Sequence, residues 1–194
     1  MTQQQEKRPP NKFLRWVKFL DRVKAWAKGE PVHKDYTTAA YSLADGKAIR
    51  RAETARVFTE VEYEGVHPEI VDFWKAMQRA MKGRNISVLA FEMLRSEERQ
   101  NALYAEGRSK AKAGQSPHQY GCAVDIVHGR RYWDLSKKEW DIIGSIGKEV
   151  ARKRNIKIEW GGDWDFYDPA HWQLKNWRLR KDEPKISRPT AYER

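Results

Sequence analysis

Residues 116–127 read SPHQYGCAVDIV, and this stretch says most about the fold. A turn that contains proline and histidine precedes a short run of small and branched residues, 121–127, which predicts a buried strand. Because successive side chains of a strand point to opposite faces, Asp125 and Val124 face opposite sides of the sheet. His118, in the preceding turn, can reach the face that carries Asp125. The stretch therefore predicts a strand that holds a carboxylate next to an imidazole.

A second informative stretch, residues 168–173, reads DPAHWQ. We predict a final strand over residues 171–174, in which His171 and Gln173 share one face while Trp172 faces the core. This strand adds a second imidazole to the predicted site.

His118, Asp125 and His171 form a donor set suited to Zn²⁺. Two neutral imidazoles and one carboxylate bind this ion and leave one coordination position open for water. Asp168, one short turn before His171, can stand beside the metal without binding it, where a general base for the water belongs. Cys122 is a conceivable fourth ligand, but alternation along the strand points its side chain away from Asp125. We therefore expect a zinc site with an acid next to it.

Helix and strand signals surround these stretches. Pro68 suits the first turn of a helix, Ser96 predicts the start of a second, and Ser136 with Glu139 forms a capping box for a third. The predicted helices cover 68–83, 96–107 and 136 to about 154. The predicted strands cover 86–91, 121–127, 156–159 and 171–174. Residues 108–117 are expected to form a mobile loop. Helices followed by short strands without crossovers predict an α+β fold, in which a small antiparallel sheet carries the zinc site and is flanked by helices.

Composition excludes several classes of protein. The chain has 194 residues, of which 34% are charged, and a mean hydropathy of -0.91. Lys or Arg interrupts the apolar stretches every few residues, which excludes an integral membrane protein. Nine Trp and a hydrophobic fraction of 40% supply ample material for a core, which argues against wholesale disorder. The single cysteine excludes an internal disulfide and every zinc site built from several cysteines.

The formal net charge of +11 is concentrated at the ends of the chain. Residues 1–60 carry 13 basic and seven acidic side chains, residues 175–194 carry seven and three, and residues 61–174 carry 18 and 17. A nucleic-acid enzyme would place its basic patch around its site, so we expect no specific nucleic-acid partner. The basic ends could hold any polyanion, such as teichoic acid, lipopolysaccharide phosphates, anionic lipid or nucleic acid. Surplus charge for solubility is the alternative.

An amphipathic helix is predicted over residues 13–28, with basic residues on one face and, on the other, Phe13, Trp16, Val17, Leu20 and Val23. Such a helix can lie on an anionic membrane surface, or it can pack on the main domain. We expect residues 1–60 to form a basic N-terminal helical extension, residues 61–176 the main domain, and residues 177–194 a basic, disordered tail. We also expect a monomer, made in the cytoplasm because no signal peptide is visible.

Four segments of the chain resemble the zinc D-Ala-D-Ala carboxypeptidase family, and within it the L-alanyl-D-glutamate endopeptidase branch used by phage endolysins. They are LRSEERQNALYAEGR at 94–108, the stretch 116–125, EWGGDW at 159–164, and DPAHWQ at 168–173. The resemblance implies that His118, Asp125 and His171 bind zinc and that Asp168 is the catalytic base. Residues 1–60 have no counterpart in it.

The resemblance also implies roles for two further residues. Arg95 would stabilise the oxyanion or the substrate carboxylate, and Ser116 would assist at the site. A guanidinium stays charged at every working pH and therefore suits developing negative charge. The alternatives are a surface arginine paired with Glu97 or Glu98 and a plain turn serine. The remaining histidines are expected to lie outside the site: His33, His67 and His128.

The function expected from this resemblance is a zinc-dependent peptidase that hydrolyses peptidoglycan stem peptides. It would be an L-alanyl-D-glutamate endopeptidase or a D-Ala-D-Ala carboxypeptidase, acting in phage lysis or cell-wall degradation after release through a membrane pore or delivery by a virion. The alternative is a non-catalytic cell-wall-binding or virion structural module with the same fold. A general base and an oxyanion donor count against this alternative, because a binding module needs neither.

Overall fold

The computed structural model describes residues 35–44 and 63–187. Within them, four short strands form one antiparallel sheet in the order β1-β2-β4-β3. The strands are β1 (Val88–Glu92), β2 (Ala123–His128), β3 (Ile158–Trp160) and β4 (His171–Leu174). The predicted α+β class and small antiparallel sheet are confirmed.

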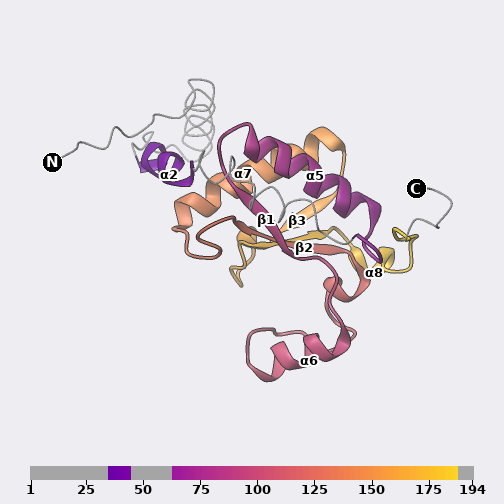
Figure 1. Ribbon diagram of the computed structural model, residues 1–194. Helices are drawn as coiled ribbons and strands as arrows, with labels where there is room; N and C mark the ends of the chain where they lie inside the picture. The colour runs from indigo at the N-terminus through magenta and orange to yellow at the C-terminus, as the bar shows by residue number, and fades with distance from the viewer. Residues whose placement is uncertain (1–34, 45–62, 188–194) are drawn as a thin grey trace.

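Helices cover one face of the sheet. The described helices are α2 (Asp35–Leu43), α5 (Pro68–Lys82), α6 (Glu97–Ala105), α7 (Lys137–Arg154) and α8 (Trp177–Arg180), with short 3-10 helices η1 (Pro117–Tyr120) and η2 (Gly161–Asp163). Helix α5 packs against β1 and β2, and α7 packs against α5 and β3. Figure 1 shows α5 and α7 on one side of the sheet and α6 on the other. The predicted site therefore lies on the face opposite α5 and α7.

Aromatic side chains fill the space between the helices and the sheet. Phe73 of α5 and Trp160 of β3 both lie against Trp172 of β4, with ring centroids 5.1 and 5.7 Å apart. Gly147 lets α7 approach closely, because a Cβ at this position would lie 2.2 Å from the Trp172 ring. The strand that carries His171 is thus supported from behind by close-packed rings.

Local capping signals in the sequence set the helix ends. The Ser136 side chain accepts a hydrogen bond from the backbone of Glu139, and the Glu139 carboxylate accepts one from the backbone of Ser136, which is the predicted capping box. Asn155 ends α7 in the left-handed conformation, with φ of 55°. His67, which has no place in the predicted site, caps α5 by accepting a hydrogen bond from Glu69 N at 3.1 Å.

Three strands begin two residues later than predicted, and one of them is β2, which starts at Ala123 rather than at residue 121. Strand β1 starts at Val88, and the preceding Ile86 forms a single bridge with Ala44. Strand β3 starts at Ile158, while Ile156 is buried in the core ahead of it. Burial alone therefore does not mark the first paired residue of these strands.

Helix α2 was not predicted, because its sequence DYTTAAYSL has weak helical periodicity and β-branched residues. It packs on α7, and Ala40 and Leu43 are fully buried. Tertiary packing rather than intrinsic propensity stabilises this helix.

Residues 177–187 differ from the disordered tail that was predicted from residue 177 onward. They begin with α8 and return to the start of α5, where Arg180 donates to both carboxylate oxygens of Glu69 and Ile186 exchanges backbone hydrogen bonds with Gly65 and Val66. The prediction missed this segment because its partners lie more than 110 positions earlier in the chain.

The predicted mobile loop, 108–117, is tied to α6. Gln100 Nε2 donates to Ser109 Oγ at 2.8 Å and to the Ala111 carbonyl at 2.6 Å, and Asn101 Oδ1 accepts from Ala113 N. These hydrogen bonds tie the loop to α6 at Ser109, Ala111 and Ala113.

The predicted amphipathic helix, residues 13–28, lies outside the described residues. None of the helices within 35–44 and 63–187 has the length and apolar character required to cross a membrane.

Candidate metal centre

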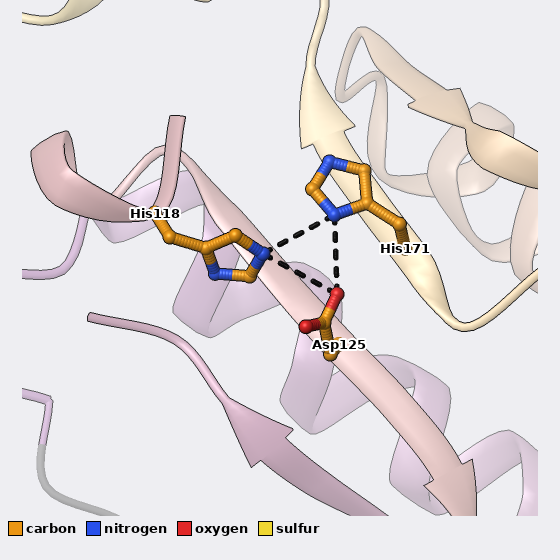
Figure 2. A group of neighbouring side chains, drawn as sticks. All are labelled: His118, Asp125 and His171. Atoms are coloured by element: carbon orange, nitrogen blue, oxygen red, sulfur yellow. Dashed lines mark hydrogen bonds and ion pairs between the residues drawn. The ribbon is translucent and has the colours of Figure 1, made fainter. Parts of the chain in front are cut away.

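His118 is positioned by the short helix η1. Pro117 begins this helix and Gly121 ends it with φ of 61°, a conformation that favours glycine. The imidazole of His118 is 2% exposed, and its Nδ1–H donates to the Met93 carbonyl at 3.2 Å. This hydrogen bond leaves Nε2 facing the sheet (Figure 2).

Asp125 and His171 are direct partners across the β2–β4 ladder, so their side chains lie on the same face. Asp125 Oδ1 is 3.1 Å from His171 Nδ1 and 3.3 Å from His118 Nε2, and the two nitrogens are 3.2 Å apart. Figure 2 shows the three polar atoms pointing toward one another. The structure thus brings the three predicted ligands together, with ligand atoms within 4.8 Å of one another.

The outward nitrogens of both imidazoles are already engaged. His118 donates from Nδ1 to the Met93 carbonyl, and His171 donates from Nε2 to Gln173 Oε1 at 3.1 Å. The orientation of the Gln173 amide follows from its Nε2, which donates to Glu159 Oε2 at 2.8 Å. Both facing nitrogens therefore carry lone pairs that converge with a carboxylate, an arrangement that needs a cation or a shared proton between the groups. The donor set fits a divalent metal.

The charges of the three groups are coupled. Burial acts to raise the pKa of Asp125, but the facing imidazoles of His118 and His171 outweigh it, so the pKa of this carboxyl lies below its usual range. Burial acts to lower the pKa of His171, and the hydrogen bond and charge of Asp125 outweigh that effect and raise it. An ionised Asp125 beside two imidazoles is the state that a metal ligand requires.

Asp168 stands beside this cluster without joining it. Its backbone N donates to the Gly161 carbonyl at 3.0 Å, and its carbonyl accepts from His171 N at 3.1 Å. Burial raises the pKa of the Asp168 carboxyl, and the charge of His171 partly opposes this. Among the described residues, the converging donors are His118, Asp125 and His171, so Asp168 is outside the set.

Arg95 is held rigidly next to Asp125. Its Nε donates to Glu92 Oε2 at 2.8 Å, its Nη2 also donates to Glu92, and its Nη1 donates to Gln100 Oε1 at 3.0 Å. Nη2 also lies 3.4 Å from Asp125 Oδ2. A guanidinium has five N–H groups, and these contacts to the described residues engage four of them. One N–H on Nη1 has no partner among these residues. The acid that pairs most closely with Arg95 is Glu92, and not Glu97 or Glu98 as in the alternative of a surface ion pair.

Ser116 and Cys122 lie near the site without contacting the cluster. Ser116 is buried at the N-cap of η1, and among the described residues no hydrogen bond from its side chain to the cluster is found. Cys122 is fully buried in the core, and its thiol donates to the Tyr120 carbonyl. The prediction was that its side chain points away from Asp125, and Cys122 does not belong to the cluster of converging donors.

Comparison with known proteins identifies the family. Residues 109–174 match the family model described as D-alanyl-D-alanine carboxypeptidase. The peptidoglycan L-alanyl-D-glutamate endopeptidase CwlK of Bacillus subtilis is 30% identical over 128 residues, which cover 56% of this chain and 73% of that protein. The chain belongs to the D-alanyl-D-alanine carboxypeptidase family of peptidases.

Two other proteins are similar to this member of the D-alanyl-D-alanine carboxypeptidase family. The L-alanyl-D-glutamate peptidase of a Listeria phage is 32% identical over 113 residues, which cover 55% of this chain and 38% of that protein. The crystal structure of the L-Ala D-Glu endopeptidase ChiX of Serratia marcescens is similar with 29% identity and a TM-score of 0.49, covering 60% of this chain and 85% of that one. The family resemblance predicted from the sequence is confirmed by the sequence relatives.

In this family member, two residues that shape the site were missed by sequence reasoning. Glu92 holds Arg95 from the end of β1, where a register shift between Ala90 and Glu92 brings it opposite Asp125. Gln100 is fully buried and connects Arg95 to the Ala111 carbonyl. The signal available in the sequence was spacing: Glu92 precedes Arg95 by three residues, and Gln100 falls on the inward side of α6.

Proposed function

We propose that this peptidase is zinc-dependent and hydrolyses the stem peptides of peptidoglycan. The observation that carries the proposal is the convergence of two imidazole nitrogens and one carboxylate oxygen. The described residues around them supply no other partner for the facing lone pairs. His118, Asp125 and His171 are the proposed ligands. Bound there, the ion supplies a Lewis acid that polarises a peptide carbonyl and lowers the pKa of water.

Asp168 is the proposed general base. It accepts the proton from the attacking water and delivers it to the leaving amine. Burial raises the pKa of this carboxyl above that of an exposed Asp, which makes the group a better proton acceptor than an ordinary carboxylate. The Trp164 ring packs near the proposed ligand His171, with the two ring centroids 5.3 Å apart.

Arg95 is proposed to stabilise the oxyanion, or the substrate carboxylate, through its remaining Nη1–H. Because Glu92 and Gln100 fix the guanidinium, this donor keeps one orientation before and during the reaction, which is the condition for electrostatic stabilisation. Ser116 is proposed to assist from the start of η1, next to the turn that carries His118.

The scissile bond is proposed from the relatives. The relatives from Bacillus subtilis and the Listeria phage are both named for the L-alanyl-D-glutamate bond, whereas the family description names D-alanyl-D-alanine. We place the L-alanyl-D-glutamate bond first and the D-alanyl-D-alanine bond second. Cell-wall degradation, as a phage endolysin or a related enzyme, is the proposed setting.

Digestion of purified sacculi tests the substrate and names the bond. Wild-type protein with Zn²⁺ should release fragments with new D-glutamate amino termini if the first bond is cleaved, and free D-alanine if the second is. Asp168→Ala serves as the matched inactive protein. Sacculi that release neither product with the zinc-loaded wild type would overturn the proposed function.

The basic ends of the chain are proposed to hold the enzyme on an anionic envelope. Deleting residues 1–30 should leave hydrolysis of a soluble stem peptide nearly unchanged and should weaken binding to anionic vesicles. Wild-type binding should fall as salt rises, since surface charge is screened over about 10 Å at 0.1 M salt. Unchanged vesicle binding after the deletion would contradict this part of the proposal.

A further inference from the structure

An open cavity of about 550 Å³ lies between the loop that follows α6 and the start of α8. It is lined by Lys110, Ala111, Gly114, Gln115 and Arg178. None of these described lining residues is acidic. This cavity has no part in the proposed metal centre, yet the chain connects the two in three ways.

The first connection is through Gln100. Its Oε1 accepts from Arg95 at 3.0 Å, and its Nε2 donates to the carbonyl of Ala111 in the cavity wall at 2.6 Å. One buried side chain thus touches both the arginine of the proposed active site and the wall of the cavity. Two hydrogen bonds of Gln100 thus join the guanidinium to the cavity wall.

The other two connections run along the chain. Gln115 of the cavity wall is followed by Ser116 and the helix that carries His118. The Lys110 ammonium lies over the Phe166 ring, 4.3 Å from its centroid, and Phe166 precedes the proposed base Asp168 by two residues. The cavity wall is therefore joined, along the chain and through one ring contact, to the segments that carry His118 and the proposed base Asp168.

The cavity is positively charged. Among residues 35–44 and 63–187, neither Lys110 nor Arg178 forms an ion pair with an acid, whereas Arg180 on the same short helix is paired with Glu69 and Glu183. Lys110 rests on Phe166, and Arg178 rests on Trp177 at 4.5 Å. An aromatic face holds a cation in place without cancelling its charge. Two held but uncompensated cations in one cavity favour an anionic ligand.

We propose that this cavity binds a carboxylate of the stem peptide on the leaving side of the scissile bond. The inference rests on the proposed function. In a stem peptide the D-glutamate residue is joined onward through its γ-carboxyl group, so its α-carboxylate is free. Cleavage of the L-alanyl-D-glutamate bond places this carboxylate next to the leaving amine. Lys110 and Arg178 would then select substrates with a free D-glutamate α-carboxylate over those in which it is an amide.

Steady-state kinetics with a pair of soluble substrates test the inference. The substrates are N-acetylmuramoyl-L-alanyl-γ-D-glutamyl-L-lysine and the same molecule with the D-glutamate α-carboxylate replaced by its amide. With zinc-loaded wild type, KM should be about tenfold lower for the carboxylate, which is of the order expected for a charge-assisted hydrogen bond. Lys110→Ala and Arg178→Ala should each raise KM for the carboxylate, leave kcat near its original value, and change little for the amide.

Lys112→Ala is the matched control. Lys112 is an exposed lysine on the same loop, its ammonium lies over Tyr104 rather than in the cavity, and its removal changes the net charge by the same amount. It should leave the preference for the carboxylate unchanged. Lys110→Arg, which keeps the charge, should retain most of the preference.

The outcomes separate this inference from the proposed function. If wild type cleaves both substrates with equal KM, or if Lys112→Ala abolishes the preference as strongly as Lys110→Ala, the carboxylate site is overturned while the peptidase assignment stands. If the zinc-loaded enzyme cleaves neither substrate and does not act on sacculi, the proposed function itself fails. Melting temperatures of the variants within about 2 °C of wild type would show that their folds are intact.

Discussion

At the level of single residues, the site depends on hydrogen bonds behind the proposed metal ligands. Met93 and Gln173 occupy the outward nitrogens of His118 and His171, so each imidazole presents a lone pair to the same point. In a similar way, the Glu92 carboxylate accepts from Arg95 Nε and orients its guanidinium. The hydrogen bonds of these neighbouring groups thus determine which imidazole nitrogens and which N–H groups remain available.

The role of Asp168 gives the first prediction. Because this residue lies outside the converging donors, Asp168→Ala should retain near-stoichiometric zinc and lose activity by about 10²–10⁴-fold, the range typical of a positioned general base. Zinc content by elemental analysis and hydrolysis of a soluble stem peptide provide the two measurements.

Ligand variants supply the contrast for this prediction. His118→Ala, Asp125→Ala and His171→Ala should lose both zinc and activity. An Asp168→Ala protein that is purified without zinc would make Asp168 a ligand and would contradict its assignment as base.

The raised pKa of Asp168 leads to a second prediction, on stability. Its folded-state pKa lies above the value of about 3.9 in an unfolded chain. Below both pKa values the group is protonated in both states and has no effect, whereas above both it is ionised in both states and destabilises the folded protein. In chelator, Asp168→Asn should therefore melt at a higher temperature than wild type at pH 7.

The difference between the two melting temperatures should shrink as the pH falls toward about 4, because Asp168 is then protonated in the folded state as well as in the unfolded state. Thermal unfolding of both proteins across this pH range is the measurement. A difference that is absent at pH 7, or that grows toward acid pH, would show that burial does not penalise this carboxylate.

At the level of helices and strands, α7 supports the ligand-bearing strand through two glycines. A Cβ at Gly144 would lie 2.3 Å from the Trp160 ring, and a Cβ at Gly147 would lie 2.2 Å from the Trp172 ring. Trp172 precedes Gln173 and follows His171, so close packing of α7 fixes the position of β4. An added atom at this contact would displace the Trp172 ring, and with it the strand that carries the proposed ligand His171.

Gly147→Ala should therefore be destabilising, although alanine favours a helix over glycine by about 1 kcal/mol. Overpacking a well-packed core costs typically about 1–3 kcal/mol, so we expect a net loss of up to about 2 kcal/mol in the free energy of unfolding. Ser145→Ala, on the same helix and only half-buried, should change stability by less than about 0.5 kcal/mol. Denaturant unfolding measures both, and a Gly147→Ala protein more stable than wild type would show that the Trp172 ring can move.

Local signals explain which elements the sequence could predict. The capping box of Ser136 and Glu139, the proline at the start of α5 and the alternation around Asp125 each act within a few residues, so they are readable without the fold. Helices α2 and α8 are stabilised by partners far along the chain, and no local pattern reports them.

The same distinction holds for the candidate site. The three proposed ligands were predictable because their strand positions and turn point them to one face. The contact between Glu92 and Arg95 was not predictable, because it depends on a register shift at the end of β1. Sequence alternation cannot anticipate an irregularity of this kind.

At the level of the whole molecule, the proposed zinc site connects three separate parts of the chain. Its ligands come from η1, β2 and β4, which span residues 117–174. A metal that binds only the folded chain stabilises it by about 2.7 kcal/mol when its free concentration is 100 times its Kd. For a chain of this size, 1 kcal/mol shifts the melting temperature by roughly 2–4 °C.

Chelation should therefore abolish hydrolysis and lower the melting temperature by about 5–10 °C, and added Zn²⁺ should restore both. The reason is that without the ion two lone pairs and a carboxylate face one another at 3.1–3.3 Å, and only a shared proton can relieve them. Asp168→Ala should show the same thermal response to chelator as wild type, because its metal ligands are intact. Asp125→Ala should show no response, because it has no metal to lose. Full hydrolytic activity in a preparation that elemental analysis shows to be free of metal would refute the zinc assignment.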